Sequence, residues 1–408
     1  MSLSCGARND REVVVTGLGV VSPYGRGSAM YWQGLSQGCC AIGPIRLFST
    51  DGFRSQMGAE VDAETVQALG IACRSRANRF IVAAAEEAVC SAALDPEELA
   101  AAAVSIGGAG GGMLEAETWY WARYGQQEGR RQRAALRTVL PTAQTDTVAW
   151  RFKMGGPRET PILACSSSAA AIAGVMDLIA TGVVEIGLAG GVDTLTRLCF
   201  MGFNALKLLD TLPCRPFARD RRGMSLGEGA AVLVLESRRH AEARGAPVRA
   251  GVAGCGMTSD AFHPTAPPAD AEGAVRAMRE ALARARLTPA DIAYVNAHGT
   301  GTVQNDRAEA VALEHVFGAG KVLVSSTKSL IGHTMGAAGA MEAVATILAM
   351  EAGLLPPTAH LTEPDPTIPF DCIANVPRPF ACDCAMSNSF GFGGQNVSLI
   401  FHRQGVTG

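Results

Sequence analysis

Short apolar runs with the character of strands alternate with alanine-rich helical stretches along most of this chain. Such alternation is typical of an α/β fold, in which helices pack on the faces of central sheets. The chain has 408 residues, enough for one large core or for two fused half-domains. We predict helices at residues 77–93, 168–181 and 273–286. We predict strands at residues 13–16, 103–107, 161–164, 185–189, 230–236, 248–255, 292–296, 322–325, 385–389 and 397–402.

The composition excludes several classes of protein. Hydrophobic residues make up 48% of the chain and charged residues 18%, as in an ordinary globular protein. The net charge of −3 gives no basic footprint for nucleic acid, and no uninterrupted apolar run of about 18 residues predicts a membrane span. The 12 cysteines are scattered without zinc-binding spacing, and no secretory signal is apparent. We therefore expect free thiols and a cytoplasmic location.

One cysteine lies where a strand-like run meets a helix-like run. Residues 161–164 have the pattern of a buried strand, and the small residues after Cys165 have the pattern of a helix start. A sulfur at a helix N-terminus faces unpaired N–H groups and the positive end of the helix dipole, which favour the thiolate over the thiol. The alternative is a buried cysteine that only fills space.

Two histidine motifs favour the catalytic interpretation of Cys165. His298 stands in the motif Asn-Ala-His-Gly-Thr-Gly-Thr, at the end of the predicted strand 292–296. His333 stands in the motif Lys-Ser-Leu-Ile-Gly-His, after the predicted strand 322–325. The chain has only 7 histidines, and two of them begin glycine-rich segments that follow strands. Loops at strand ends commonly carry functional residues, so we expect both rings to face a ligand.

Together with the loop Gly391-Phe392-Gly393-Gly394, these motifs resemble those of the condensing enzymes of the thiolase superfamily. The match is to the β-ketoacyl-ACP synthases of the Cys-His-His type, synthases I and II, and it covers nearly the whole chain in the family's motif order. The resemblance implies a five-layered α-β-α-β-α fold made of two similar halves. The first half, residues 1–245, would carry Cys165, and the second, residues 246–408, would carry both histidines.

The implied reaction is a decarboxylative Claisen condensation between an acyl thioester held on Cys165 and malonyl-ACP. Such an acyltransferase, of the 3-oxoacyl-ACP synthase II kind, elongates chains in fatty-acid, polyketide or polyene synthesis. Cys165 is the expected nucleophile, and the amides of Cys165 and Phe392 are the expected oxyanion hole. His298 and His333 would donate N–H bonds to the enolate oxygen, and Lys328 would tune the field around them.

The resemblance also implies supporting and substrate-binding residues. Glu342 is expected beside Lys328. A monovalent cation is expected near Asn296, Glu342, Ser387 and Asn388. The residues expected to bind the substrate or its phosphopantetheine arm are Thr300, Thr302, Thr265, Phe392, Gly110 and Phe203, with Phe392 as the gate of the acyl pocket.

Two features depart from the long-chain synthases. Such enzymes often carry a bulky aliphatic residue where Gly110 aligns, and its loss would deepen or widen the acyl pocket. We therefore hypothesise that this chain accepts longer, rigid or aryl-bearing acyl groups. Three serines follow Cys165, a sequence more similar to polyketide synthases than to housekeeping fatty-acid synthases.

The expected partners are acyl carrier protein and either an identical or a related second chain, with no cofactor, nucleic acid or membrane. Local basic clusters could meet an acidic carrier. They are Arg130, Arg131, Arg133 and Arg137, or Arg215, Arg219, Arg221 and Arg222.

Other functions remain for comparison. The alternative of a different class is a non-catalytic chain-length-factor-like partner subunit, which would lack the nucleophile. A thiolase would need a second cysteine in the loop that carries Phe392, and a type III synthase would have asparagine in place of His333. A cysteine hydrolase would account for Cys165 and one histidine, but not for the second histidine.

Overall fold

The computed structural model describes residues 11–124 and 136–404 of the chain. Its main feature is a 12-stranded sheet with the strand order β14-β12-β11-β16-β17-β10-β1-β9-β7-β5-β6, to which β2 is added beside β1. The strands of this sheet are β1 (Val13–Ser22), β2 (Gly25–Arg26), β5 (Ala103–Gly107), β6 (Arg158–Glu159), β7 (Ile186–Asp193), β9 (Gly229–Ser237), β10 (Ala250–Ser259), β11 (Tyr294–Asn296), β12 (Leu323–Ser325), β14 (Asp371–Cys372), β16 (Cys384–Gly391) and β17 (Gln395–Arg403).

The sheet consists of two halves with the same topology. In the first half the strands lie in the order β1-β9-β7-β5-β6, and in the second half in the order β10-β17-β16-β11-β12. In each half the first three strands are antiparallel and the last three run parallel. The halves are joined where β1 pairs with β10 through Val13, Val14 and Val15. The expected fold of two similar halves is confirmed, whereas the boundary between residues 245 and 246 stays a prediction.

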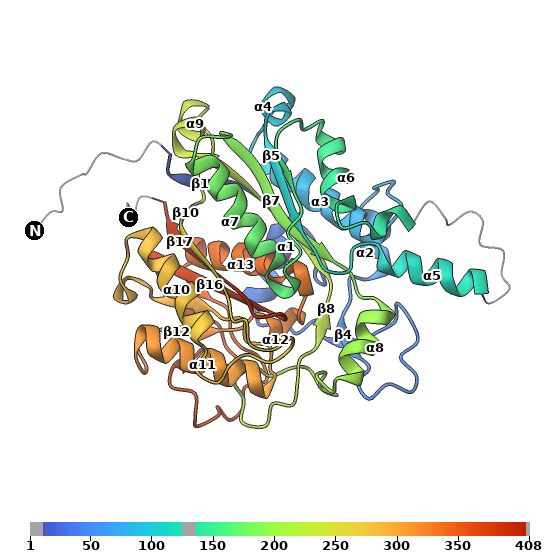
Figure 1. Cartoon of the computed structure of the whole chain (residues 1–408), viewed down its shortest axis with the longest axis vertical. Coiled ribbons are helices and arrows are strands. Elements are labelled where there is room, and N and C mark those ends of the chain that lie inside the picture. Colours follow the sequence, from blue (N-terminus) through green and yellow to red (C-terminus); the bar gives the residue numbers. More distant parts are fainter. Residues whose placement is uncertain (1–10, 125–135, 405–408) are drawn as a thin grey trace, which may run out of the picture.

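Helices form three layers around the two half-sheets (Figure 1). Helices α7 (Ser167–Ala180) and α13 (Ala338–Ala352) pack on each other between the half-sheets. Helices α3 (Arg76–Ser91) and α6 (Ala143–Phe152) lie against the first half-sheet. On the far side of the second half-sheet α10 (Glu272–Ala285) packs on β10 and β17, with α11 (Val303–Phe317) beside α10. The α-β-α-β-α architecture is therefore confirmed.

The central position of α7 and α13 follows from their sequences. Both are rich in alanine and apolar all round, and such helices are stable only when buried on every side. The segment Met335–Ala352 is long and apolar enough to cross a membrane, but 89% of it is buried inside the protein, as expected of a core helix. The outer helix α10 instead places Val275, Met278 and Leu282 toward the sheet.

The remaining elements are short and lie around this frame. Two small sheets contain β3 (Gly43–Pro44), β4 (Met57–Ala59) and β8 (Leu226–Gly227), and β13 (Leu354–Leu355) with β15 (Arg378–Pro379). The other helices are α1 (Ser28–Ser36), α2 (Ala63–Ala68), α4 (Pro96–Ala100), α5 (Met113–Tyr124), α8 (Arg197–Ala205), α9 (Arg238–Ala243) and α12 (Lys328–Ile331), with 3-10 turns η2 (Ala164–Ser166), η3 (Pro289–Asp291) and η4 (Met335–Ala337).

The predicted strand at residues 161–164 is wrong. Pairing with β5 ends at β6, and the chain then runs without ladder bonds until it turns at η2. The last pair of this ladder is Ser105 with Glu159, and β5 ends two residues later at Gly107, so residues 161–164 run past the end of the only strand beside them in the described part of the chain. The apolar pattern of residues 161–164 is typical of a strand, but a strand forms only where a neighbouring strand offers backbone hydrogen bonds.

Candidate active site

Cys165 lies in the turn η2, directly before α7. The preceding residue, Ala164, has φ 50°, a left-handed conformation that side chains disfavour. Ser166 holds this turn in place, because its hydroxyl donates to the carbonyls of Ser389 at 3.0 Å and Gln395 at 2.7 Å. Those carbonyls belong to β16 and β17, so the second half of the chain positions a nucleophile of the first half.

The environment of Cys165 favours the neutral thiol at rest. Its side chain is buried, and this burial raises the pKa of the thiol to about 11. The charge of Lys328 and a backbone hydrogen bond from Phe392 lower the pKa, but they do not offset the desolvation. Burial thus outweighs the preference for the thiolate that we expected from the helix N-terminus. The thiolate must form in the course of reaction.

His298 is held by the helix that follows its loop. The backbone N–H groups of His298 and Gly299 donate to the carboxylate of Glu309 at 2.8 and 2.7 Å. Glu309 lies on α11, so the two backbone groups tie the loop to that helix. The Nδ1 atom of the ring lies 3.4 Å from the ammonium of Lys328. Burial, followed by the charge of Lys328, holds the pKa of His298 well below its usual range, so the ring is neutral.

His333 follows α12 and points at the sulfur. Its backbone N–H donates to the carbonyl of Ser225 at 2.7 Å, and its Nε2 lies 2.9 Å from Cys165 Sγ. The backbone N–H of Met335 donates to its Nδ1 at 3.3 Å. Burial and then the charge of Lys328 hold the pKa of His333 well below its usual range, which keeps this ring neutral as well.

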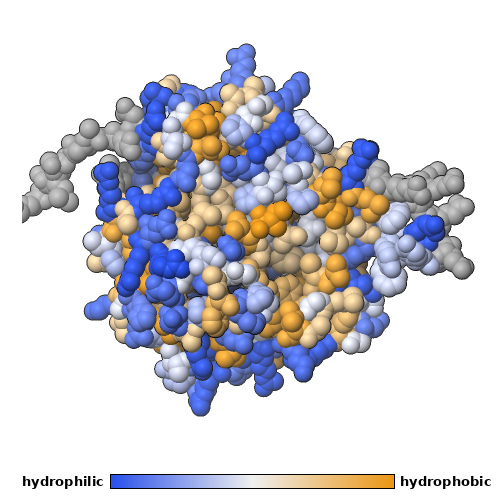
Figure 2. Space-filling model, viewed as in Figure 1, coloured by the Kyte–Doolittle hydropathy of each residue, from blue (hydrophilic) through white to orange (hydrophobic). Residues whose placement is uncertain are grey.

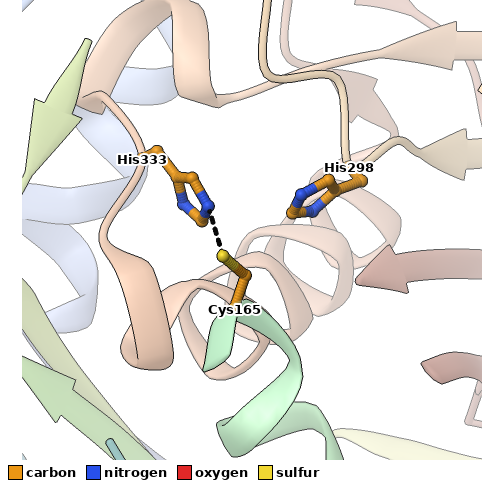
Figure 3. Close-up of side chains that lie close together, drawn as sticks. All are labelled: Cys165, His298 and His333. Carbon is orange, nitrogen blue, oxygen red and sulfur yellow. Dashed lines mark hydrogen bonds between the residues drawn. The ribbon is translucent and has the colours of Figure 1, made fainter. Parts of the chain in front are cut away.

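The three side chains converge on one point (Figure 3). The sulfur of Cys165 and one nitrogen from each ring all lie within 4.8 Å of one another. The ring centroids of His298 and His333 are 5.3 Å apart, with an angle of 86° between the planes. The spatial convergence on which the sequence interpretation depends is thus present.

This cluster has the composition of a zinc site, but its surroundings suit hydrogen-bond donation. A metal-binding histidine normally donates its second N–H to an acceptor. Here the Nδ1 atoms face donors instead, Lys328 beside His298 and the Met335 amide beside His333. A neutral imidazole that accepts at Nδ1 carries its proton on Nε2. Both rings therefore present N–H groups to the site.

Lys328 is buried and forms an ion pair with Glu342, as expected. Burial raises the pKa of Glu342, and the neighbouring ammonium opposes that shift. Because an unpaired buried charge is far more costly than a paired one, the glutamate is what allows Lys328 to stay charged beside two neutral imidazoles. Lys328 thus delivers a positive field to the site through its contact with His298.

The residues of the expected cation site fit a cation that prefers oxygen ligands. Three buried side-chain oxygens have no hydrogen-bond partner, namely Asn296 Oδ1, Glu342 Oε2 and Ser387 Oγ. Buried polar atoms without partners are rare and often mark an ion. The side chain of Asn388 is engaged elsewhere, with Ser398 and Met278, so only its backbone carbonyl could contribute.

All three residues line a pocket that holds about 620 Å³ of empty space, open solvent at its mouth included. Its wall includes five of the predicted substrate-binding residues: Phe203, Thr265, Thr300, Thr302 and Phe392. The rings of Phe203 and Phe392 lie side by side in this wall, with centroids 5.8 Å apart.

Gly391 explains how the Phe392 loop approaches the nucleophile so closely. A Cβ atom on Gly391 would lie 2.7 Å from the carbonyl oxygen of Leu163 and 3.3 Å from the amide nitrogen of Cys165. Only glycine therefore allows this contact. The two amides expected to form an oxyanion hole lie on the two sides of that contact.

Gly110 does not line this pocket. It lines a second cavity, formed by Gly107–Gly111 and by Val139, Pro141, Gln144 and Ile162. Gly107, in the wall of this cavity, packs against the backbone of Ser167, two residues after the nucleophile, since a Cβ atom on Gly107 would lie 2.4 Å from the Ser167 carbonyl carbon. The predicted contact of Gly110 with substrate therefore depends on an acyl chain that reaches this second cavity.

The second predicted basic cluster is only partly at the surface, because two of its four arginines, Arg219 and Arg222, are exposed and two are buried. Arg215 is buried and paired with Asp210 at 3.3 Å, and Arg221 is buried and paired with Asp365. Arg219 is exposed and forms a surface ion pair with Glu363, so Arg215 and Arg221 have structural roles while Arg219 and Arg222 face solvent. In the first cluster, Arg130, Arg131 and Arg133 lie outside the described residues.

Several residues of the site escaped the sequence interpretation. Glu309 holds the His298 loop, Ser166 holds the nucleophile turn, and Asp193 accepts from the amide of Gly336 beside His333 at 2.6 Å. A signal existed for Glu309, because Asp306 and Glu309 stand one helical turn apart and share a face. Asp193 gave only the weak signal of a carboxylate that ends an apolar strand.

Comparison with known proteins agrees with this geometry. Residues 10–241 match the family model "Beta-ketoacyl synthase, N-terminal domain", and residues 249–362 match "Beta-ketoacyl synthase, C-terminal domain". Nodulation protein E of Rhizobium sp. (strain N33) is 38% identical over 97% of this chain and 100% of its own. 3-Oxoacyl-[acyl-carrier-protein] synthase 2 of Synechocystis sp. is 36% identical over 96% of this chain and 98% of its own.

Among solved structures, the ishigamide ketosynthase/chain length factor is similar over nearly the whole length. The superposition has a TM-score of 0.92 at 34% identity and covers 98% of this chain and 100% of that one.

Proposed function

Because this chain belongs to the β-ketoacyl synthase family of condensing enzymes, we propose that it joins an acyl thioester on Cys165 to malonyl-ACP with loss of carbon dioxide. The observation that carries the proposal is the convergence of one sulfur and two N–H-donating imidazoles at the base of a single pocket. A nucleophile and two neutral donors meet the needs of a Claisen condensation, whereas hydrolysis would not need the second ring.

In the first step the sulfur of Cys165 attacks the carbonyl carbon of an acyl thioester. A carbon–sulfur bond to Cys165 forms, the bond to the carrier sulfur breaks, and the departing thiol takes up the proton that Cys165 loses. The amides of Cys165 and Phe392 stabilise the tetrahedral oxygen. Donation from His333 Nε2, 2.9 Å from the sulfur, helps the thiolate to form despite burial.

In the second step malonyl-ACP loses carbon dioxide. The electron pair of the breaking carbon–carbon bond forms an enolate, whose charge lies on the thioester oxygen. The Nε2–H groups of His298 and His333 donate to that oxygen, and each such donor contributes about 3 kcal/mol in a dry site. Neutral rings are suited to this role, since both keep their single proton where the oxygen needs it.

In the third step the enolate carbon attacks the acyl carbon on Cys165. A carbon–carbon bond forms, the bond to sulfur breaks, and the thiolate recovers a proton. No cofactor is required, because decarboxylation supplies the carbanion. A cation held by Asn296, Glu342 and Ser387 would stabilise the negative charge of Glu342, which forms an ion pair with Lys328.

The proposed partners are acyl carrier protein and a second, identical or related chain. Thr300 and Thr302 line the pocket and could hydrogen-bond a phosphopantetheine arm. Support for a paired chain comes from the ishigamide ketosynthase/chain length factor. Apolar side chains also gather across the face shown in Figure 2. The large exposed apolar residues include Leu140, Ile162, Leu198 and Met201.

The proposal is tested by incubating the protein with acyl-ACPs of several chain lengths and locating the adduct by mass spectrometry. We expect an acyl group on Cys165, and a β-ketoacyl product after malonyl-ACP is added. The matched control is Cys73→Ala, which changes a cysteine that does not line the site. Folded protein that gives no adduct with any acyl-ACP would instead support a non-catalytic, chain-length-factor-like subunit.

A further inference from the structure

A buried carboxylate, that of Asp193, connects two segments: the one that follows His333 and the glycine-rich one that contains Gly110. Asp193 ends β7 and is fully buried, and no ion pair neutralises it within the described part of the chain. Its Oδ2 accepts from the amides of Ala109 at 2.9 Å and Gly336 at 2.6 Å, and its Oδ1 accepts from the amide of Gly110 at 2.6 Å. Backbone dipoles thus hold a charge that usually requires a cation.

These contacts bridge the two halves of the molecule. Ala109 and Gly110 follow β5 in the first half, whereas Gly336 lies in η4 of the second, three residues after His333. The space for the carboxylate is made by glycines. A Cβ atom on Gly336 would lie 2.7 Å from Asp193 Oδ2, and one on Gly110 would lie 3.3 Å from Oδ1.

The contact with Gly336 acts on His333 through one residue. Met335 has φ 50°, a conformation that costs a non-glycine residue roughly 1 kcal/mol and persists only when its surroundings hold it. Asp193 holds the next amide, and the Met335 N–H is thereby aimed at His333 Nδ1 at 3.3 Å. That donor keeps the imidazole proton on Nε2, which faces Cys165 Sγ.

We propose that Asp193 is a positioning residue that fixes the tautomer of His333 by holding the strained turn at Met335 and Gly336. The inference rests on the proposed function only for its effect on turnover. Its structural content is that His333 carries its proton on Nε2 in the resting protein, and that this preference depends on Asp193.

The test is a comparison of wild type and Asp193→Asn by two-bond ¹H–¹⁵N NMR of histidine-labelled protein, with His333 assigned from the His333→Ala spectrum. In wild type we expect the Nε2–H pattern. In Asp193→Asn the side-chain NH₂ group, itself a donor, faces backbone N–H donors, so one of these hydrogen bonds is lost and the turn at Gly336 is held less firmly. The Met335 N–H is then no longer fixed on His333 Nδ1, and we expect a mixture of tautomers. We also expect condensation kcat to fall at least about tenfold, with the substrate KM nearly unchanged.

Controls separate this role from a loss of stability. Glu236→Gln removes another fully buried carboxylate, bound by Arg244 and remote from the pocket. We expect it to lower the melting temperature without changing the His333 spectrum. If Asp193→Asn does not fold, Gly336→Ala places a Cβ atom 2.7 Å from both Asp193 Oδ2 and the backbone of Gly108, and the resulting loss of the Asp193 contact should give the same mixture of tautomers.

Two results would overturn the proposal. One is a wild-type spectrum with the proton of His333 on Nδ1, whatever the variants do. The other is an unchanged His333 tautomer in a folded Asp193 variant, whatever its rate of condensation. Failure of the proposed function is distinguishable, because it would appear as the absence of an acyl adduct on wild-type Cys165 while the NMR result stands.

Discussion

At the scale of single residues, the site depends on keeping ionisable groups neutral until they react. Burial raises the pKa of the Cys165 thiol and lowers the pKa of both histidines, so the resting cluster carries little charge of its own. The field comes from Lys328, which is kept charged by Glu342. This arrangement suits a reaction in which negative charge appears only briefly, first on sulfur and then on an enolate oxygen.

The raised pKa of Cys165 gives a pH dependence with a definite sign. With a thiol pKa of about 11, the thiolate is a small fraction of the protein at neutral pH. As long as the pH stays below the pKa, the thiolate fraction rises about tenfold for each unit by which the pH is raised. We therefore expect iodoacetamide to alkylate Cys165 about ten times faster for each pH unit between about pH 7 and pH 9. Mass spectrometry of the Cys165 peptide would measure this rate. A rate that levels off below about pH 8 would contradict the raised pKa.

Gly110 carries the second prediction at this scale. The cavity that it lines begins beside the backbone of Ser167, so the far end of a long acyl chain could lodge there. We expect Gly110→Ile to fill this space and shift the products toward shorter chains in assays with a panel of acyl-ACPs. The control is Gly43→Ile, the same change at a glycine that does not line this cavity and where a new Cβ meets nothing within 4 Å. An unchanged chain-length profile would remove the hypothesis of an enlarged pocket, provided that Asp193, 3.3 Å from the new Cβ, is shown to stay in place.

At the scale of elements, the loop after β16 is placed by one close approach. We expect Gly391→Ala to push the loop away from Leu163 and Cys165, which would displace the Phe392 amide from the sulfur. Because misplacement by about 1 Å costs on the order of a hundredfold in rate, adduct formation should slow at least about tenfold. The matched control is Gly202→Ala in α8, where a new Cβ meets nothing within 4 Å and helix propensity slightly improves. Equal adduct formation rates in the two variants would exclude this role of the loop.

The elements also show how far sequence alone could go. The central helices, most strands and the convergence of Cys165 with two histidines were predictable, because apolar periodicity and family motifs encode them. The absence of a strand at 161–164 was not, since pairing depends on a neighbour and β5 ends at Gly107. The raised pKa of Cys165 was not predictable, because desolvation depends on the surrounding packing, which the helix start does not reveal. The role of Asp193 was not predictable either, because its partners are far away in the sequence. Gly110 lies 83 residues before it and Gly336 lies 143 residues after it.

At the scale of the whole molecule, the two halves share one interior. The central core joins residues of both, including Val15 and Ile172 from the first and Val344 and Leu399 from the second. We expect residues 1–245 and 246–408, produced separately, each to lack a cooperative thermal transition, because each would expose the face that covers the other. Near-UV circular dichroism and calorimetry would check this. A fragment that unfolds cooperatively alone would show that the halves are independent domains.

The matching topologies have one consequence for chemistry. Each half contains a tight turn before its central helix, η2 with Ala164 at φ 50° and η4 with Met335 at φ 50°. The residue after the strained position is a cysteine in one copy and Gly336 in the other, where Asp193 takes up the room a side chain would need. The same turn therefore serves two purposes in the two halves. In the first half it presents the sulfur of Cys165, and in the second half the equivalent place is filled by the carboxylate of Asp193, which holds the turn next to His333.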